Sequence, residues 1–296
     1  MTSRQVITLN DGNTIPRLGL GVWKAADGKE VETAVLTAIQ AGYRLIDTAM
    51  VYQNERGVGN AIRASGIDRK ELFITTKLWN NDQGADKVRP ALLASLERLG
   101  LEYIDLYLIH WPMPAVGKYL ETWREFELLQ KEGLIRSIGV SNFHVKHLEE
   151  LKKHSRVLPA VNQIELHPYF QQTELREYCK SQGIRVECWS PLGGSGSNLL
   201  GDPLIEKIAK KYAKTAAQVV LRWHLQNDLV VIPKSSNPQR IKENFAVFDF
   251  ILSPSDMRAI ATLDTGERSG PDPDTMNIRV NAKVVDAAVK VREWFR

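Results

Sequence analysis

The stretch Tyr43–Glu55, "YRLIDTAMVYQNE", changes character at its fifth residue. Apolar residues that suit a buried strand are followed at once by Asp47, and Tyr52 then comes on an irregular connection. A carboxylate at the end of an apolar run is costly to bury unless a partner pairs with it. The stretch therefore predicts a buried strand that ends in a polar site shared by Asp47 and Tyr52.

Short apolar runs of this kind recur on both sides of the stretch, separated by amphipathic segments such as "VRPALLASLERLG" and "LREYCKSQG". Several of these segments end in a glycine, which suits a helix C-cap. The predicted strands are Leu18–Gly21, Arg44–Ile46, Leu72–Thr76, Ile104–Ile109, Ile135–Val140, Ala160–Ile164, Ile184–Trp189 and Leu229–Ile232. Eight strands separated by helices predict an α/β fold, a (β/α)8 TIM barrel of typically about 250 residues before additions.

Both ends of the chain extend this barrel. The turn residues Asn10-Asp11-Gly12 predict an N-terminal β-hairpin. Because no Pro- or Ser-rich linker divides the chain, residues 1–276 are expected to form a single barrel domain. Residues 277–296 form a C-terminal extension in which Ala282–Phe295 has helix-like apolar spacing, suited either to docking on the barrel or to a subunit contact. A monomer is expected, with a dimer as the alternative.

A doubly wound sheet is the alternative fold, and the segment "GVGNAIRASG" tests it. A dinucleotide-binding turn requires a strand, a tight glycine turn and a helix in that order. No buried strand immediately precedes Gly57, and the third glycine is misplaced. We therefore interpret Gly57 and Gly59 as residues that let a helix pack closely against its neighbour.

Composition argues against several classes of function. The chain is 43% hydrophobic and 25% charged, as is ordinary for a soluble protein, and its net charge of +4 is scattered, so no nucleic-acid partner is expected. The N-terminal residues lack an apolar signal core and no apolar segment approaches membrane length, so no membrane partner is expected either. Cys179 and Cys188 are too few for a disulfide framework and are expected to be reduced in a cytoplasmic protein.

In a barrel, the residues that follow the strands meet at one mouth, where catalytic sites lie. Asp47 and Tyr52 follow the second strand, Lys77 ends the third and His110 follows the fourth. A tyrosine with a pKa of about 10 is poorly matched to proton transfer near neutral pH, but an adjacent ammonium lowers that pKa. We predict that Asp47 holds Lys77 and that Lys77 lowers the pKa of Tyr52. His110 then hydrogen-bonds a carbonyl oxygen or the Tyr52 hydroxyl, so that a proton reaches an oxygen while a second reagent attacks the carbon.

Six motifs resemble the aldo-keto reductase family, and together they extend from about Val6 to Met276: "GYRLIDTAMVYQNERGVG", "FITTKLW", "IDLYLIHWP", "IGVSNF", "VNQIELHP" and "VIPKSSNPQRIKENF". The catalytic residues of the family correspond to Asp47, Tyr52, Lys77 and His110. The resemblance implies an NADPH-dependent reductase of aldehydes and ketones that needs no metal. Within the family, "HWPMPAVGKY", Trp189 and "GPDPD" are most similar to bacterial 2,5-diketo-D-gluconate reductases, which implies 2,5-diketo-D-gluconate, methylglyoxal or β-keto esters as substrates.

Candidate cofactor-binding residues are inferred partly from their side-chain chemistry and partly from the resemblance. The carboxamide of nicotinamide needs donors and acceptors, and the ring needs a flat aromatic face. The basic segment "IPKSSNPQRIKEN" resembles the family's clamp on the adenosine 2′-phosphate, and "LGGSGSNLLG" is interpreted as a belt over the pyrophosphate, a plain flexible loop being the alternative. The predicted residues are Ser141, Asn142, Gln163 and Trp189 at the nicotinamide, Ser190, Leu192 and Gly193 around the glycine-rich segment, Lys234, Ser235, Ser236 and Arg240 at the 2′-phosphate, and Glu243 and Asn244 at the adenine.

Tryptophans follow several of the predicted strands, where a closed core would not need them. We predict that Trp23, Trp79 and Trp111 line a pocket for a small carbonyl compound.

Three other functions compete with the reductase. A glycoside hydrolase would use two carboxylates, for which Glu165 and Glu187 are candidates, but it would leave Lys77 and Tyr52 unexplained. A metal site at His144, His147 and His154 lacks a carboxylate or cysteine cluster in the sequence, and solvated helix residues are the simpler interpretation. A non-catalytic NADPH-binding subunit shares the fold and the cofactor, and it would turn over poorly.

Overall fold

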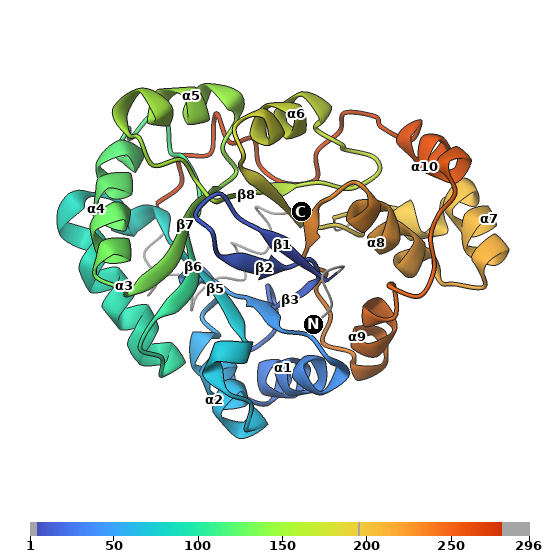
Figure 1. Cartoon of the computed structure of the whole chain (residues 1–296), viewed down its shortest axis with the longest axis horizontal. Coiled ribbons are helices and arrows are strands. Elements are labelled where there is room, and N and C mark those ends of the chain that lie inside the picture. Colours follow the sequence, from blue (N-terminus) through green and yellow to red (C-terminus); the bar gives the residue numbers. More distant parts are fainter. Residues whose placement is uncertain (1–4, 195, 280–296) are drawn as a thin grey trace.

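The computed structural model of the chain describes residues 5–194 and 196–279. Eight parallel strands form one sheet in the order β10-β9-β8-β7-β6-β5-β4-β3. The two edges meet through parallel bridges between Leu18 and Val231 and between Gly21 and Lys234, which close the sheet into a barrel inside a ring of helices (Figure 1). The (β/α)8 barrel predicted from the sequence is therefore confirmed.

The observed strand boundaries differ from the predicted ones by at most two residues. The barrel strands are β3 (Gly19–Gly21), β4 (Leu45–Asp47), β5 (Phe73–Leu78), β6 (Ile104–Ile109), β7 (Ile135–Ser141), β8 (Val161–Glu165), β9 (Arg185–Trp189) and β10 (Val230–Val231). The helices are α1 (Lys29–Ala41), α2 (Glu55–Ser65), α3 (Ala85–Leu99), α4 (Tyr119–Lys131), α5 (Val145–His154), α6 (Thr173–Ser181), α7 (Pro203–Tyr212), α8 (Ala216–Gln226), α9 (Pro238–Phe245) and α10 (Pro254–Ala261).

The N-terminal hairpin closes one end of the barrel. Strands β1 (Val6–Thr8) and β2 (Thr14–Pro16) pair antiparallel, as the turn residues between them predict. In Figure 1 the hairpin lies across the centre of the ring of helices. Ile7 and Ile15 form one buried cluster with Leu45 and Leu106 from the barrel strands. The opposite end, where the strands finish, is therefore the end at which a site can form.

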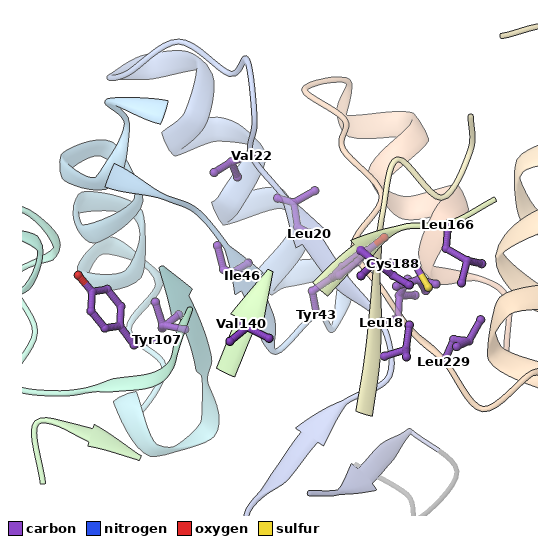
Figure 2. Close-up of a cluster of buried hydrophobic side chains, with 14 of the residues drawn as sticks. Leu18, Leu20, Val22, Tyr43, Ile46, Tyr107, Val140, Leu166, Cys188 and Leu229 are labelled. Carbon is purple, nitrogen blue, oxygen red and sulfur yellow. The ribbon is translucent and has the colours of Figure 1, made fainter. Parts of the chain in front are cut away.

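Alternation along β4 explains why Asp47 faces the barrel interior. Leu45 belongs to the inner cluster beneath the hairpin, whereas Ile46 belongs to the cluster between the barrel and its helices (Figure 2). Because successive side chains of a strand point to opposite faces, Asp47 points inward again, one layer above Leu45. Each large apolar side chain that is buried in these clusters contributes about 1.5–3 kcal/mol, which offsets the cost of holding a charge inside.

The two glycines of α2 serve helix packing, as predicted. A Cβ atom at Gly57 would collide with Val31 of α1, and one at Gly59 would collide with the backbone of Leu99 at the end of α3. Only a residue without a side chain permits this close approach.

The segment after α10 crosses the mouth of the barrel. The carboxylate of Glu165 accepts hydrogen bonds from the backbone N–H groups of Ser269 (2.6 Å) and Gly270 (3.0 Å). Further along, Met276 and Ile278 pack with Trp79. The helix-like spacing predicted for Ala282–Phe295 lies outside the described residues. Within the described part of the chain, no helix has both the length and the apolar character that a membrane crossing requires.

Candidate active site

Four side chains from three neighbouring segments converge at the mouth. Lys77 is fully buried, and its Nζ donates to Asp47 Oδ1 at 2.6 Å, to the backbone oxygen of Thr48 at 2.9 Å and to the Tyr52 hydroxyl at 3.4 Å. The ring of His110 lies edge-on to that of Tyr52, with 5.9 Å between the ring centroids. The predicted cluster of acid, phenol, ammonium and imidazole is thus brought together in space.

Tyr52 is held in place by a network on the connection after β4. It ends the short 3-10 helix Met50–Tyr52. Two residues later the buried Asn54 donates to the backbone oxygens of Val22 and Ala25 and accepts from the Thr48 hydroxyl at 2.7 Å. These bonds tie the connections after β3 and β4 together, so the phenol is fixed relative to Lys77.

The pKa of Tyr52 is shifted in the direction opposite to the prediction. Burial raises the pKa of Tyr52 above its usual value of 10, and the opposing effect of Lys77 does not overcome it. The charge of Asp47 acts in the same direction as burial. The prediction of a lowered pKa was therefore wrong in net direction, because it counted the ammonium but not the loss of water around the phenol. Tyr52 is protonated at neutral pH.

The pKa values of His110 and Lys77 are also set by burial and by neighbouring charges. Burial lowers the pKa of His110 well below its usual value, and Lys77 lowers it further, so the imidazole is neutral at neutral pH. Burial disfavours the charged form of Lys77, but Asp47 and Tyr52 outweigh it and the pKa of Lys77 lies above its usual value. The site therefore combines a permanent cation with a neutral hydrogen-bonding ring. The buried Nδ1 of His110 finds no partner among the described residues.

Polar side chains at the ends of β7 and β8 lie beside this cluster. The Nδ2 of Asn142 donates to the backbone oxygen of His110 and to Ser141 Oγ, both at 3.0 Å, and its Oδ1 accepts from Trp189 Nε1 at 2.8 Å. Gln163 Nε2 reaches Asp47 Oδ2 at 2.8 Å. The four residues predicted at the nicotinamide thus form one hydrogen-bonded group that joins the charged cluster.

The remaining predicted cofactor residues lie after β9 and β10. Ser190 has a left-handed backbone with a φ of 49°, and its carbonyl accepts from Gly193 N at 2.9 Å, so a tight turn directs the glycine-rich segment away from β9. Lys234 and Arg240 are exposed, whereas Asn244 is buried. The other residues predicted there are Leu192, Ser235, Ser236 and Glu243, each of them half-buried.

An acidic side chain stands beside the basic ones. The Ser236 hydroxyl donates to Glu30 Oε1 at 2.6 Å, and this hydrogen bond is the largest cause of the lowered pKa of Glu30. Lys234 is close enough to lower that pKa further. Glu30 belongs to α1, more than two hundred positions earlier in the chain, and no pattern in the sequence indicates that the two segments meet.

The predicted tryptophans separate into two groups. Trp79 and Trp111 are nearly fully buried and form one apolar cluster, and the Trp79 ring lies edge-on to His110 at 5.1 Å between centroids. Trp23 is half-buried, with Lys24 Nζ 4.2 Å from its ring centroid, and it does not belong to that cluster. The residues that sequence reasoning missed in this cluster are Met50, Val51, Met113, Val116, Met276 and Ile278.

The histidines of α5 acquire the carboxylate that the sequence did not reveal. Asp274 Oδ1 lies 3.0 Å from His144 Nδ1 and 3.4 Å from His147 Nε2, whereas His154 contacts Glu150 instead. His147 Nδ1 accepts from the backbone N–H of His144 at 3.1 Å, which places the proton of a neutral His147 ring on Nε2. His144 thus hydrogen-bonds Asp274 and anchors the C-terminal segment, whereas the buried His147 Nε2 makes no hydrogen bond among the described residues.

The two candidate glycosidase carboxylates have other roles. Glu165 is engaged by the backbone of Ser269 and Gly270, as described above, and also by the Ser269 hydroxyl. Glu187 is fully buried, and its Oε2 accepts from Gln163 Nε2 at 2.7 Å. Neither carboxylate is arranged as an exposed acid or base beside a sugar-sized cleft.

Comparisons with known proteins agree with this geometry. The model of the aldo/keto reductase family matches residues 17–265. Methylglyoxal reductase DkgA of Escherichia coli (strain K12) is 53% identical over 274 residues, covering 93% of this chain and 98% of that protein. An aldo-keto reductase of Mycolicibacterium smegmatis is 55% identical over 271 residues, covering 92% of this chain and 98% of that protein.

Solved structures give the same result. The crystal structure of an aldo/keto reductase from Brucella melitensis superimposes with a TM-score of 0.84 at 54% identity, covering 88% of this chain and 99% of that one. That of a mutant of Gox0644 in complex with NADPH gives a TM-score of 0.88 at 48% identity, covering 94% of this chain and 100% of that one. Fold, site and sequence therefore agree, and this chain belongs to the aldo/keto reductase family.

Proposed function

We propose that this aldo-keto reductase uses NADPH to reduce small aldehydes and ketones to alcohols, with Tyr52 as the proton donor and residues 1–276 as the reductase domain. The observation that carries the proposal is the fully buried Lys77, which donates both to Asp47 and to the Tyr52 hydroxyl. A buried ammonium paired on one side and directed at a phenol on the other has a clear use in proton transfer.

The residues around the mouth fit NADPH. Ser141, Asn142 and Gln163 supply amide and hydroxyl groups next to the catalytic cluster, and Trp189 supplies an aromatic face beside them. At the other end, the exposed cations Lys234 and Arg240 suit the 2′-phosphate. These two groups lie after neighbouring barrel strands, as an elongated dinucleotide requires.

The chemistry then divides between cofactor and protein. When bound, NADPH supplies the hydride that adds to the carbonyl carbon. Tyr52 donates its proton to the carbonyl oxygen, and the neutral His110 orients that oxygen by hydrogen bonding. Lys77 stabilises the phenolate that Tyr52 becomes, and Asp47 keeps the ammonium in place. Because Tyr52 is protonated at neutral pH, the free enzyme is ready for reduction.

The substrate is proposed to be a small carbonyl compound. The apolar cluster of Trp79, Trp111, Met113 and Met276 borders His110. A substrate held against this cluster would make its polar contacts with the proposed catalytic residues. Methylglyoxal is the first candidate because a relative that is 53% identical bears that activity in its name. 2,5-Diketo-D-gluconate and β-keto esters are the other candidates, and Trp23 is retained as a rim residue that such larger substrates would reach.

The test is a substrate panel. Purified protein is mixed with NADPH and either methylglyoxal, 2,5-diketo-D-gluconate or a β-keto ester, and consumption of the reduced cofactor is followed by its absorbance. We expect turnover with at least one of them and a preference for NADPH over NADH. Tight NADPH binding without turnover on any carbonyl would instead identify a non-catalytic NADPH-binding subunit. Hydrolysis of a glycoside without cofactor would overturn the assignment altogether.

A further inference from the structure

A second buried carboxylate, that of Glu187, lies inside the barrel beside the Asp47–Lys77 pair. Glu187 on β9 is fully buried, and its Oε2 accepts from Gln163 Nε2 at 2.7 Å. The same nitrogen donates to Asp47 Oδ2 at 2.8 Å. The other oxygen of Glu187, Oε1, is buried and finds no partner among the described residues. The proton transfer described above makes no use of Glu187, so its presence requires a separate explanation.

These two bonds define the orientation of the Gln163 amide. An amide nitrogen carries two hydrogens, and here one is directed at Asp47 on β4 and the other at Glu187 on β9. One such bond determines which end of the amide faces inward, but the amide can still rotate about it. Two bonds to acceptors on different strands fix the plane of the amide as well. The side-chain oxygen, Oε1, is left as the end that can accept a hydrogen bond.

Both side-chain polar groups of the neighbouring Asn142 are already engaged in hydrogen bonds. Its Nδ2 donates to His110 and Ser141, and its Oδ1 accepts from Trp189. No described residue donates to Gln163 Oε1, so this oxygen is an available acceptor next to Ser141 and Asn142. The nicotinamide carboxamide carries an NH2 group that needs an acceptor.

We propose that Glu187 is a positioning residue, which locks the Gln163 amide so that its oxygen accepts from the carboxamide NH2 group of the nicotinamide. The inference rests on the proposed NADPH-dependent function and goes beyond it, because it assigns a role to a residue that touches neither cofactor nor substrate. A fixed acceptor limits rotation of the nicotinamide and thereby sets which face of the ring meets the carbonyl carbon.

The charges around Glu187 support this role. Asp47, Lys77 and Tyr52 are the titratable groups that face it, and burial together with the charge of Asp47 raises the pKa of Glu187 to about 8. Glu187 is therefore mainly neutral at neutral pH, and it adds little negative charge to a site that already holds the Asp47–Lys77 pair. A neutral glutamine of the same size, with its oxygen toward Gln163, reproduces this form.

The experiment compares two ligands and two variants. NADP⁺ and ADP-ribose 2′-phosphate share the 2′-phosphate end, but only NADP⁺ carries nicotinamide. Their dissociation constants are measured by isothermal titration calorimetry for the wild type, Glu187→Leu and Glu187→Gln. We expect Glu187→Leu to weaken NADP⁺ by about 5-fold, the effect of one lost neutral hydrogen bond, and to leave ADP-ribose 2′-phosphate unchanged. Glu187→Gln should stay within about 2-fold of wild type for both ligands.

Two further variants keep the proposal open to refutation. Gln163→Leu should show the same loss confined to NADP⁺, and adding Glu187→Leu to it should cause no further loss, because the two act through one contact. Equal weakening of both ligands by Glu187→Leu, or of neither, overturns the proposal. Glu187→Met replaces Glu187→Leu if the latter does not fold, and failure of both to fold while Glu187→Gln folds also counts against a role confined to positioning. A wild type that binds neither ligand would refute the proposed function itself.

Discussion

The ammonium of Lys77 lies 3.4 Å from the phenolic oxygen of Tyr52. Its bond to Asp47 is much shorter, at 2.6 Å, so in the free enzyme the cation belongs mainly to the carboxylate. Burial meanwhile keeps the pKa of Tyr52 above 10. The phenol therefore keeps its proton in the free enzyme. In the mechanism that we propose, the ammonium stabilises the negative charge left on the phenol after that proton is transferred.

Tyr52→Phe removes the proton donor and keeps the ring. We expect kcat for carbonyl reduction to fall by about 10²- to 10⁴-fold, the usual contribution of general acid catalysis. NADPH affinity, measured by fluorescence titration, should remain within about 2-fold because the proposed cofactor residues lie on other strands. Near-normal turnover in this variant would show that another group is the acid.

Lys77→Met leaves the Asp47 carboxylate buried without its cation. We expect the free energy of unfolding to fall by about 3–5 kcal/mol, as when one partner of a buried ion pair is removed. The double variant Asp47→Asn, Lys77→Met should recover most of this loss because no uncompensated charge remains. Urea unfolding followed by circular dichroism measures all three proteins, and equal stabilities of single and double variants would contradict the pairing.

Arg240→Ala tests the phosphate clamp. We expect the dissociation constant of NADPH to rise by about 10-fold, the effect of losing one charge-assisted hydrogen bond, while that of NADH changes little. Calorimetric titration with both cofactors gives the comparison. A similar loss for NADH would place Arg240 elsewhere on the cofactor.

Glu30→Gln removes a negative charge from the same region. The Glu30 carboxylate accepts from the Ser236 hydroxyl and lies near Lys234. Its negative charge would disfavour the 2′-phosphate that we propose to bind there. We expect NADPH to bind about 2- to 5-fold more tightly, with NADH unaffected, and the gain to diminish at high salt as surface charges are screened. Weaker NADPH binding would mean that Glu30 organises the clamp.

His147 is expected to make stability depend on pH. Burial lowers the pKa of His147 to about 4, with Asp274 opposing, so the folded state favours the neutral ring while the unfolded chain protonates near 6.5. Its contribution is therefore complete above a pH of about 6.5 and is lost as the pH falls toward about 4. His147→Gln keeps an acceptor at this capping position but does not titrate. Lowering the pH from neutral to about 4.5 should thus destabilise the wild type more than the variant in unfolding measurements; equal losses would contradict the assignment.

The barrel and the convergence of the four candidate catalytic side chains were predictable because both follow from local patterns. Apolar runs that end in polar residues locate the strands, and parallel strands bring their ends to one mouth. Asp47, Lys77 and His110 needed no knowledge of distant partners, since each is placed by its own strand. Tyr52 was harder, because its position depends on the network around Asn54.

Partnerships between distant segments were not predictable in the same way. Asp274 joins His144 across 130 positions, and Glu30 joins Ser236 across 206. The hydrogen bond between Glu187 and Gln163 joins two neighbouring strands, and neither strand's own pattern indicates it. The pKa of Tyr52 was misjudged for a related reason: a sequence lists neighbouring charges but not the amount of water that folding removes.

Glu165 grips the C-terminal segment mainly by main-chain N–H groups, which every residue except proline possesses. The contact also depends on the absence of a side chain at Gly270, where a Cβ atom would collide with the Trp189 ring. Further along, the Asp274 side chain adds an anchor through His144, and neither contact involves the side chains of Met276 and Ile278. We therefore expect exchanges at these two positions to alter which carbonyl compounds are accepted, and to leave the arrangement of Asp47, Tyr52 and Lys77 as it is.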